Sequence, residues 1–298
     1  MLNKTYLSYL IFYCFLLSCG SHGSSPGTGR VQIIVVPEAS ITEGIKSGNG
    51  DEDMHDGWQI QYNKFLISLG YFEAQRTDTK ERLFHDKTYI LDLKNAPAQG
   101  YLVTEWDRVP AARFDKFSYR TVNAQPSATI LEPTSSADLE LMIQNNYSIY
   151  FEGVAQKGNE KITFKWGFNA GTSFEDCASE DGFSGFAVPL NGSVQIKPTI
   201  HGDHQYFDNI TQGVELTKRL GAWMNICNQN KDGILTTEEL KSCVVQQALP
   251  TPPYDLTGIK DQDNDHKITV YDYVNSQMRT LGDYQGSGEC PTRKPFSL

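Results

Sequence analysis

The stretch from Tyr147 to Phe168, YSIYFEGVAQKGNEKITFKWGF, alternates apolar and polar side chains on both sides of a short connection. Its apolar members recur at every second position and would share one face of a strand: Tyr147, Ile149 and Phe151, then Ile162, Phe164, Trp166 and Phe168. A period of two indicates β-strands with one buried face. Because the connection at 156–160 is short and contains a glycine, the stretch predicts a β-hairpin.

Further strands of this kind are expected within residues 31–211, at 31–36, 58–69, 89–93, 114–122 and 194–200. The phase of the alternation shifts near Asn63 and Lys64, which predicts a β-bulge. One short helix is expected, from Ser136 to Ile143. Because strands with one apolar face need a second layer to cover it, we predict a two-sheet β-sandwich over residues 31–211.

The composition narrows the classes of function. The chain has 298 residues, with 36 Asp and Glu against 26 Lys and Arg, and a formal net charge of −10. An acidic chain is poorly suited to binding nucleic-acid phosphates, so we expect no nucleic-acid partner. The same excess of carboxylates is suited to binding cations.

The N-terminal residues MLNKTYLSYLIFYCFLLSCG carry one basic residue and then an apolar run from Tyr6 to Leu17. The run is shorter than the roughly 20 residues of a membrane-spanning helix and has the shape of a secretory signal. Its end, LLSCG at 16–20, resembles the processing site of bacterial lipoproteins. The resemblance implies a signal peptide over residues 1–18, a lipid on Cys19 that anchors the chain to a membrane, and a place in the bacterial cell envelope, at the outer membrane or periplasmic face. Ordinary secretion with later cleavage is the alternative.

Residues 19–30, rich in glycine and serine, are expected to form a flexible tether. Four cysteines would remain beyond it: Cys177, Cys227, Cys243 and Cys290. An exported compartment permits disulfides, and four cysteines allow two bridges in three pairings. Free buried thiols are the alternative.

An acidic loop, NQNKDGILTTEE, spans residues 228–239. Oxygen-bearing side chains fall at its positions 1, 3, 5, 9 and 12, and Gly233 at position 6 permits the positive φ of a tight turn. Ca²⁺ takes six to eight oxygen ligands, which this spacing can gather. The spacing resembles the EF-hand loop, and the resemblance implies ligation by Asn228, Asn230, Asp232, the Ile234 carbonyl, Thr236 and Glu239.

A second loop, DQDNDHKITVYD, spans residues 261–272 and begins 33 residues after the first. That separation is typical of a facing pair of EF-hands. The resemblance implies ligation by Asp261, Asp263, Asp265, the Lys267 carbonyl, Thr269 and Asp272.

Apolar residues at helical spacing flank both loops. They are Leu216, Leu220, Trp223 and Cys227 before the first loop, Leu240, Cys243 and Val244 after it, and Val274, Met278 and Leu281 after the second. A short helix is expected over 254–260, and Gly282 as the cap of the last helix. We therefore predict a multi-domain β plus α chain: an N-terminal β-sandwich, a small all-α EF-hand pair over residues 212–285, and a tail over 286–298. The EF-hand analogy also places Cys227 and Cys243 between the helices, which implies a disulfide between them.

Both loops depart from the EF-hand pattern. Asn228 and Asn230 replace carboxylates in the first, while in the second His266 stands in place of glycine and Asp272 is shorter than the usual glutamate. We expect calcium affinities near the weak end of the range, about 10⁻⁴ to 10⁻³ M. A metal-free pair that serves as a helical dock is the alternative.

A second group of metal-ligand types is His201, Asp203 and His204, with His55 as a further candidate. These residues could ligate Zn²⁺ or Cu²⁺; the alternative is that they form hydrogen bonds at the junction between the β part and the helical part. The stretches 109–115 and 56–58, together with His201, resemble the β-sandwich periplasmic proteins associated with methanobactin copper handling. This resemblance implies copper at His201 or His204.

The sequence contains no GxSxG, HExxH, Walker or GxGxxG motif, so it favours a protein without enzyme activity. We expect a calcium-binding lipoprotein of the bacterial envelope with a structural or ligand-binding role. A copper- or zinc-binding protein is the alternative. A protein or a glycan as the partner of the β part stays open.

Overall fold

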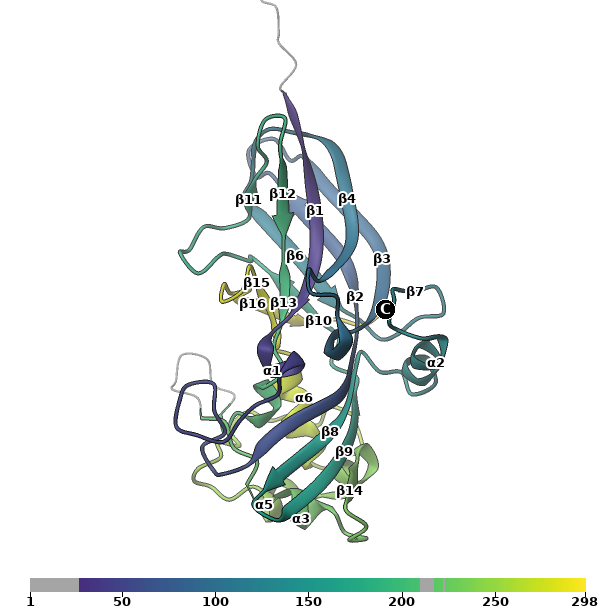
Figure 1. Ribbon diagram of the computed structural model, residues 1–298, viewed down its shortest axis with the longest axis vertical. Coiled ribbons are helices and arrows are strands. Elements are labelled where there is room, and N and C mark those ends of the chain that lie inside the picture. The colour runs from purple at the N-terminus through teal and green to yellow at the C-terminus, as the bar shows by residue number, and fades with distance from the viewer. Residues whose placement is uncertain (1–26, 210–216, 222) are drawn as a thin grey trace, which may run out of the picture.

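The protein is described by a computed structural model that covers residues 27–209, 217–221 and 223–298 (Figure 1). The predicted signal peptide at 1–18, the predicted lipid site Cys19 and most of the tether lie outside the described residues. The last three residues of the predicted tether form the start of a strand instead. Thr28 pairs there with Pro110, and Arg30 with Ser193, so two neighbouring strands order a segment whose glycine content alone predicts flexibility.

Strands predominate among the described residues, and the helices have at most nine residues each. The strands are β1 (Thr28–Pro37), β2 (Gln59–Gln75), β3 (Arg82–Asp92), β4 (Tyr101–Pro110), β5 (Arg113–Phe114), β6 (Lys116–Thr121), β7 (Thr129–Ile130), β8 (Ile149–Lys157), β9 (Glu160–Phe168), β10 (Thr172–Glu175), β11 (Phe186–Ala187), β12 (Ser193–Ile196), β13 (Pro198–Ile200), β14 (Ile234–Thr236), β15 (Gly282–Tyr284) and β16 (Thr292–Pro295). The helices are α1 (Ala39–Thr42), α2 (Ser136–Gln144), α3 (Trp223–Cys227), α4 (Thr237–Ser242), α5 (Val245–Ala248) and α6 (Val270–Met278), with 3-10 turns η1 (Leu93–Asn95) and η2 (His204–Tyr206).

The long strand β2 runs through the middle of the molecule and joins its two halves (Figure 1). It pairs antiparallel with β8 along its first half, and with β6 and β3 along its second half. The β8 and β6 pairings meet at Ser68, whose N–H donates to the carbonyl of Ser148 and whose carbonyl accepts from the N–H of Val122. Because both bonds of Ser68 point to the same side, β6 and β8 act as one long strand interrupted by residues 123–147. The larger sheet then runs in the order β14-β9-β8-β2-β6-β10-β16, with β3 paired to β2 and β7 paired to β3.

A smaller sheet has the order β12-β1-β13-β15, with β4 paired to β1. Apolar side chains of β1, such as Val31 and Ile33, share one buried cluster with Phe72 and Phe117 of the larger sheet. The predicted β-rich body is thus confirmed, with its core between the two sheets.

Three local predictions are confirmed. The predicted hairpin pairs from Ile149 with Phe168 to Lys157 with Glu160. The pairing of β2 with β8 shifts between Tyr62 and Lys64, which is the predicted bulge. Helix α2 covers the expected residues, and Ser135 caps it by accepting from the N–H of Asp138.

The predicted fold class was wrong in its second half, because no small all-α EF-hand pair forms in the described residues. β14 and β16 join the larger sheet and β15 joins the smaller one, and the short helices α3 and α6 pack against the larger sheet. The ring of Tyr271 in α6 stacks on Phe168 at 5.3 Å, and Trp223 in α3 lies 5.6 Å from Trp166. The C-terminal helices α3 and α6 therefore pack on the aromatic face of the predicted hairpin.

The two acidic loops also fail to pair with each other. Residues 234–236 of the first loop form β14, which runs parallel to β9 with Leu235 beside Phe164. In the second loop, Thr269 forms its β-bridge with Val244 instead. The first loop therefore pairs with β9, at the edge of the larger sheet, where an EF-hand would pair with the second loop.

The predicted flanking helices are shorter or absent. Leu216 lies outside the described residues, and 217–221 are not helical because Lys218 forms β-bridges to Met54 and Phe207. Residues 254–260 are irregular apart from a turn at 257–258, where the N–H of Thr257 donates to Asp255 Oδ1. Helix α6 ends at Met278 with Arg279 as its C-cap, and Gly282 begins β15 rather than capping the helix.

Two disulfides connect the described cysteines, Cys227 with Cys243 and Cys177 with Cys290. The first is the pairing that the EF-hand analogy implied, although the helices around it differ. It closes a loop of 16 residues, which stabilises the fold by about 3 kcal/mol in the chain-entropy picture. Among the described residues no helix has the length and hydropathy needed to cross a membrane.

Removal of residues 212–298 tests whether the C-terminal part belongs to the same folding unit. We expect the shortened chain to lose cooperative thermal unfolding, because it lacks β14, β15, β16 and the partner of Cys177. Far-ultraviolet circular dichroism and calorimetry measure the transition. An independent β-sandwich would instead keep a sharp transition near that of the full chain, which would contradict the shared architecture.

Candidate metal sites

The first acidic loop is folded by its own side chains. Asn230 Oδ1 accepts from the N–H of Asp232 at 3.0 Å, and Asp232 Oδ1 accepts from the N–H of Ile234 at 2.8 Å. Gly233 adopts φ +78°, as its place in the turn requires. The turn leads directly into β14, so pairing with β9 fixes the exit of the loop.

Two oxygen atoms of this loop are buried without a hydrogen-bond partner among the described residues: Asn228 Oδ1 and Glu239 Oε1. They belong to loop positions 1 and 12, the two ends of the ligand set. Leaving a buried acceptor unsatisfied costs about 1–3 kcal/mol. The other oxygen of Glu239, Oε2, accepts from the N–H of Thr236 at 3.0 Å and so holds the carboxylate at the start of α4.

The second loop brings three carboxylates together. Acceptor atoms of Asp261, Asp263 and Asp265 all lie within 4.8 Å of one another. Although desolvation opposes ionisation, N–H groups of His266, Asn264 and Asp265 hold the pKa of Asp261 below its usual value. His266 adopts φ +67°, so it takes the left-handed conformation that glycine has in the first loop.

The last predicted ligand of the second loop has another role in this conformation. Asp272 is fully buried, with Oδ1 accepting from the N–H of Gln262 at 2.6 Å and Oδ2 from the N–H of Thr269 at 2.8 Å. The Thr269 hydroxyl also donates to Oδ2. Asp272 therefore closes the loop and caps α6 and is not part of the convergent group.

Lysine side chains approach the second loop where a cation would sit. Lys241 Nζ of α4 lies 3.3 Å from Asp263 Oδ2 and 4.7 Å from the centre of the Tyr271 ring. Lys267 Nζ lies 3.8 Å from Asp265 Oδ2. α4, which begins in the first loop, thus supplies a counter-ion to the second.

The histidine group lies directly after β13 of the smaller sheet and at the start of η2. His201, Asp203 and His204 have ligand atoms within 4.8 Å of one another. His201 Nδ1 lies 2.8 Å from Glu38 Oε2, and its Nε2 lies 2.7 Å from Asp283 Oδ2. Sequence reasoning missed both carboxylates. Glu38 follows β1 and Asp283 lies in β15, and these two strands come together only in the folded sheet, on either side of β13.

Two cations that belong to the fold offset most of the negative charge in this group. Desolvation opposes protonation of His201, but Asp203, Asp283 and Glu38 outweigh it and raise its pKa to about 12. Burial lowers the pKa of His204 to about 4. The buried ammonium of Lys218 lies 2.9 Å from Asp203 Oδ2, so Asp203 also has a permanent cationic partner.

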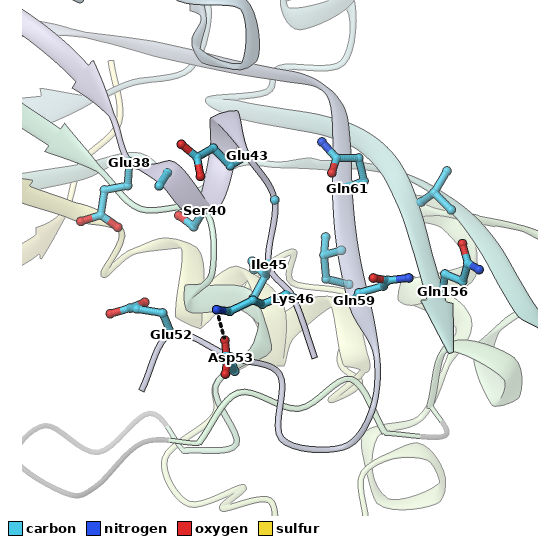
Figure 2. Close-up of a pocket in the computed structure, with 14 residues that line it drawn as sticks. Glu38, Ser40, Glu43, Ile45, Lys46, Glu52, Asp53, Gln59, Gln61 and Gln156 are labelled. Atoms are coloured by element: carbon cyan, nitrogen blue, oxygen red, sulfur yellow. Dashed lines mark ion pairs between the residues drawn. The ribbon is translucent and has the colours of Figure 1, made fainter. Parts of the chain in front are cut away.

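The remaining candidate, His55, is not part of this group. Its Nε2 lies 3.0 Å from the carbonyl of Gly50. A polar cleft of about 680 Å³ separates this loop from β2 and β8, and Figure 2 shows Glu38 and Glu52 on its wall. Because Glu38 contacts His201 and Glu52 contacts Lys218, the cleft leads from solvent to the outer partners of the buried group.

Comparisons add no relative: a scan of protein families, a search of curated proteins and a search of solved structures each found no match to this chain.

The pKa values of the two buried histidines predict opposite pH dependences of stability. His201 has its pKa raised from 6.5 to about 12, so the stability gained from its imidazolium is complete below pH 6.5 and is lost as the pH rises toward 12. His204 has its pKa lowered to about 4, so stability falls as the pH drops from 6.5 toward 4. His201→Gln should remove a slope of up to about 1.4 kcal/mol per pH unit on the alkaline side, measured by urea unfolding.

His204→Gln should flatten the acid side only, and His55→Gln serves as the control. An alkaline slope that persists unchanged in His201→Gln would refute a buried imidazolium at this position.

Proposed function

We propose that this chain is an exported calcium-binding protein of the bacterial cell envelope, held there by a lipid on Cys19, with Ca²⁺ stabilising its C-terminal loops. The observation that carries the proposal is the convergence of Asp261, Asp263 and Asp265 within 4.8 Å in a loop of EF-hand spacing. Three carboxylates this close repel one another, and a divalent cation with oxygen ligands relieves that repulsion.

The first loop supports the same function by a different argument. Asn228 Oδ1 and Glu239 Oε1 are already desolvated and have no partner among the described residues. A bound cation would satisfy both atoms without further burial of polar groups. With only Asp232 and Glu239 as anionic ligands, this site is expected to be the weaker one.

The scaffold favours a structural role over a switch. The Cys227–Cys243 bridge spans the first loop, and β14 is fixed to β9. The N–H of Val270 also bonds to the carbonyl of Cys243, which ties the start of α6 to the end of α4. Two disulfides agree with an extracytoplasmic location, where calcium is abundant enough to fill weak sites.

A transition-metal site is the second candidate function, and one observation favours it. Asp203 Oδ1 is buried without a hydrogen-bond partner in the described part, beside His201 and His204. Because the lowered pKa of His204 keeps its imidazole neutral, that ring is ready to ligate a metal. To bind His201, copper or zinc would have to displace one of the two protons that its imidazolium donates, from Nδ1 to Glu38 or from Nε2 to Asp283.

Calorimetric titration of chelator-treated protein with CaCl₂ tests the first function. We expect binding near 10⁻⁴ to 10⁻³ M, and for a Kd of about 1 mM, 10 mM Ca²⁺ should raise the free energy of unfolding by about 1.4 kcal/mol per site. Asp263→Asn with Asp265→Asn should abolish binding at the second loop, and Asp232→Asn at the first. Asp181→Asn, in an exposed turn, is the matched control.

An absence of calcium uptake at 10 mM with an unchanged melting temperature in EDTA would defeat the calcium function. Elemental analysis of protein purified without chelators tests the second candidate. One copper or zinc per chain, lost in His204→Ala, would favour it.

Lys241→Gln gives a separate prediction about the second loop. The substitution removes the ammonium that occupies Asp263, so calcium affinity there should rise about two- to fivefold, the range expected for a partly exposed ion pair. Lys294→Gln, which removes a charge paired with Glu175 on β10, controls for net charge. Equal affinities in Lys241→Gln and in the control would show that Lys241 does not compete with calcium.

A further inference from the structure

The solvent face of the larger sheet carries a row of aromatic rings from β3, β2 and the residue that follows β16. Tyr71 lies between Phe84 and Phe296, with ring centres 6.4 and 5.9 Å apart. The side chain of Phe84 is one of the large apolar groups exposed on the surface, at 38%. Aromatic rings are costly to leave in water, so a row of them indicates a contact surface.

A strained bulge places the central ring on this face. The pairing of β2 with β3 shifts between Gly70 and Phe72 and that with β6 between Gly70 and Glu73, and Tyr71 adopts φ +53°. A left-handed conformation costs a residue with a side chain roughly 1–2 kcal/mol. The bulge reverses the phase of β2, so that Phe72 is buried and Tyr71 faces solvent, and such bulges are frequent beside binding sites.

Two arginines on this face stack on aromatic rings in the same way but differ in their ion pairs. Arg82 lies 4.1 Å over Phe84 and binds Glu73 through two bonds of 2.6 and 2.9 Å. Arg120 lies 4.4 Å over Phe296, yet it forms no ion pair with any residue that the structure describes. A guanidinium held flat on a ring and lacking a carboxylate is pre-organised to bind one through two parallel bonds.

A small polar hollow of about 220 Å³ lies beside Arg120, between β2, β6 and β10. Its three carboxylates already have cations: Glu73 has Arg82, Glu175 has Lys294 and Asp176 has Lys116. The charge of Arg120 is therefore the one left over locally, although the chain as a whole is acidic. Charges beyond a Debye length of about 8 Å are largely screened at physiological salt. The positive charge near Arg120, rather than the net charge of the chain, therefore determines which ligands this face attracts.

The volume of the hollow and the pairing of the strands around it limit which class of ligand can bind. It is smaller than the roughly 300–1,000 Å³ of sites for drug-sized molecules, which suits a single ring of a larger ligand. β2, β6 and β10 are each paired on both edges, so an extended peptide cannot add itself as a strand there. A sugar ring presents flat C–H faces to aromatic rings and hydroxyls to carboxylates and amides, and both kinds of group are present here.

We propose that this face binds a carboxylated sugar unit of an oligosaccharide, with its carboxylate on Arg120 and a ring face on the aromatic row at Tyr71. The hydroxyl groups of the sugar donate to Glu73 and Glu175 at the rim of the hollow. This binding needs neither acidic loop, so it stands apart from the calcium function.

Titration of the full mature chain with trigalacturonate, by calorimetry and by ligand-detected magnetic resonance, tests the proposal. Arg120→Gln should weaken binding at least tenfold, and Arg120→Lys should restore part of it, because an ammonium keeps the charge but not the paired bonds. Tyr71→Gly should also weaken binding while relieving the φ strain. Arg82→Gln, at the matched stack that already has a carboxylate, should change the affinity less than threefold.

Cellotriose, poly-glutamate and inorganic phosphate distinguish the ligand classes. Weak or absent binding of all three supports an acidic sugar. Equal binding of poly-glutamate would point to an acidic peptide, equal binding of cellotriose would remove the role of Arg120, and equal binding of phosphate would reduce the site to a simple anion contact. Any of these outcomes, or no binding of trigalacturonate at millimolar concentration in a chain with an unchanged melting temperature, would overturn the proposal.

Discussion

The two halves of the molecule depend on the unbroken backbone pairing of β2. Along one edge of this strand, β6 and β8 meet at Ser68, so each half is built on one end of the same ladder. Ser68 is completely buried, and water cannot replace either of its backbone bonds. The interruption between the two partner strands is consequently confined to residues 123–147, which leave the ladder and return to it. Bulges at Asn63 and Tyr71 then set which side chains of β2 enter the core and which face solvent.

This ladder also explains why the C-terminal segment is not a separate domain. β9 would be an edge strand with unpaired backbone groups if β14 did not cover it, and an exposed edge favours aggregation. The aromatic residues of β8 and β9 form a wide apolar face, which α3 and α6 cover through Trp223 and Tyr271. Burial of this face stabilises both partners, so the acidic loops sit on a rigid sheet. A site on such a scaffold holds its ligands in place but moves little when an ion binds.

The sequence pattern predicted the features that depend on interactions between neighbouring residues in the chain. Alternation gave the hairpin and the bulge near Lys64, and loop spacing gave the left-handed residues Gly233 and His266. Prediction from the sequence failed where one segment could pack against either of two partners. Leu235 could pair with the second loop or with Phe164, and the long sheet edge offered more contacts than one short loop. In the described residues the helix expected before the first loop forms only over Trp223–Cys227, and Lys218, which lies in the interior beside Asp203, is in β-bridges instead. Glu38 and Asp283, which complete the histidine group, lie 163 and 82 positions from His201 along the chain, and no short spacing could reveal them.

The two groups of carboxylates differ chiefly in burial, and burial decides what can neutralise them. Asp203 is nearly inaccessible to water, so its charge requires cations that belong to the fold, and His201 and Lys218 supply them at fixed positions. Asp261 and Asp263 are partly exposed, so solvent and mobile ions can reach them, and Lys241 is only a partly exposed neighbour. The cations around Asp203 are side chains of the fold itself and are difficult to exchange. A cation bound at Asp261 and Asp263 can exchange with the solvent. For this reason the acidic loops are better candidates for reversible ion binding than the buried histidine group.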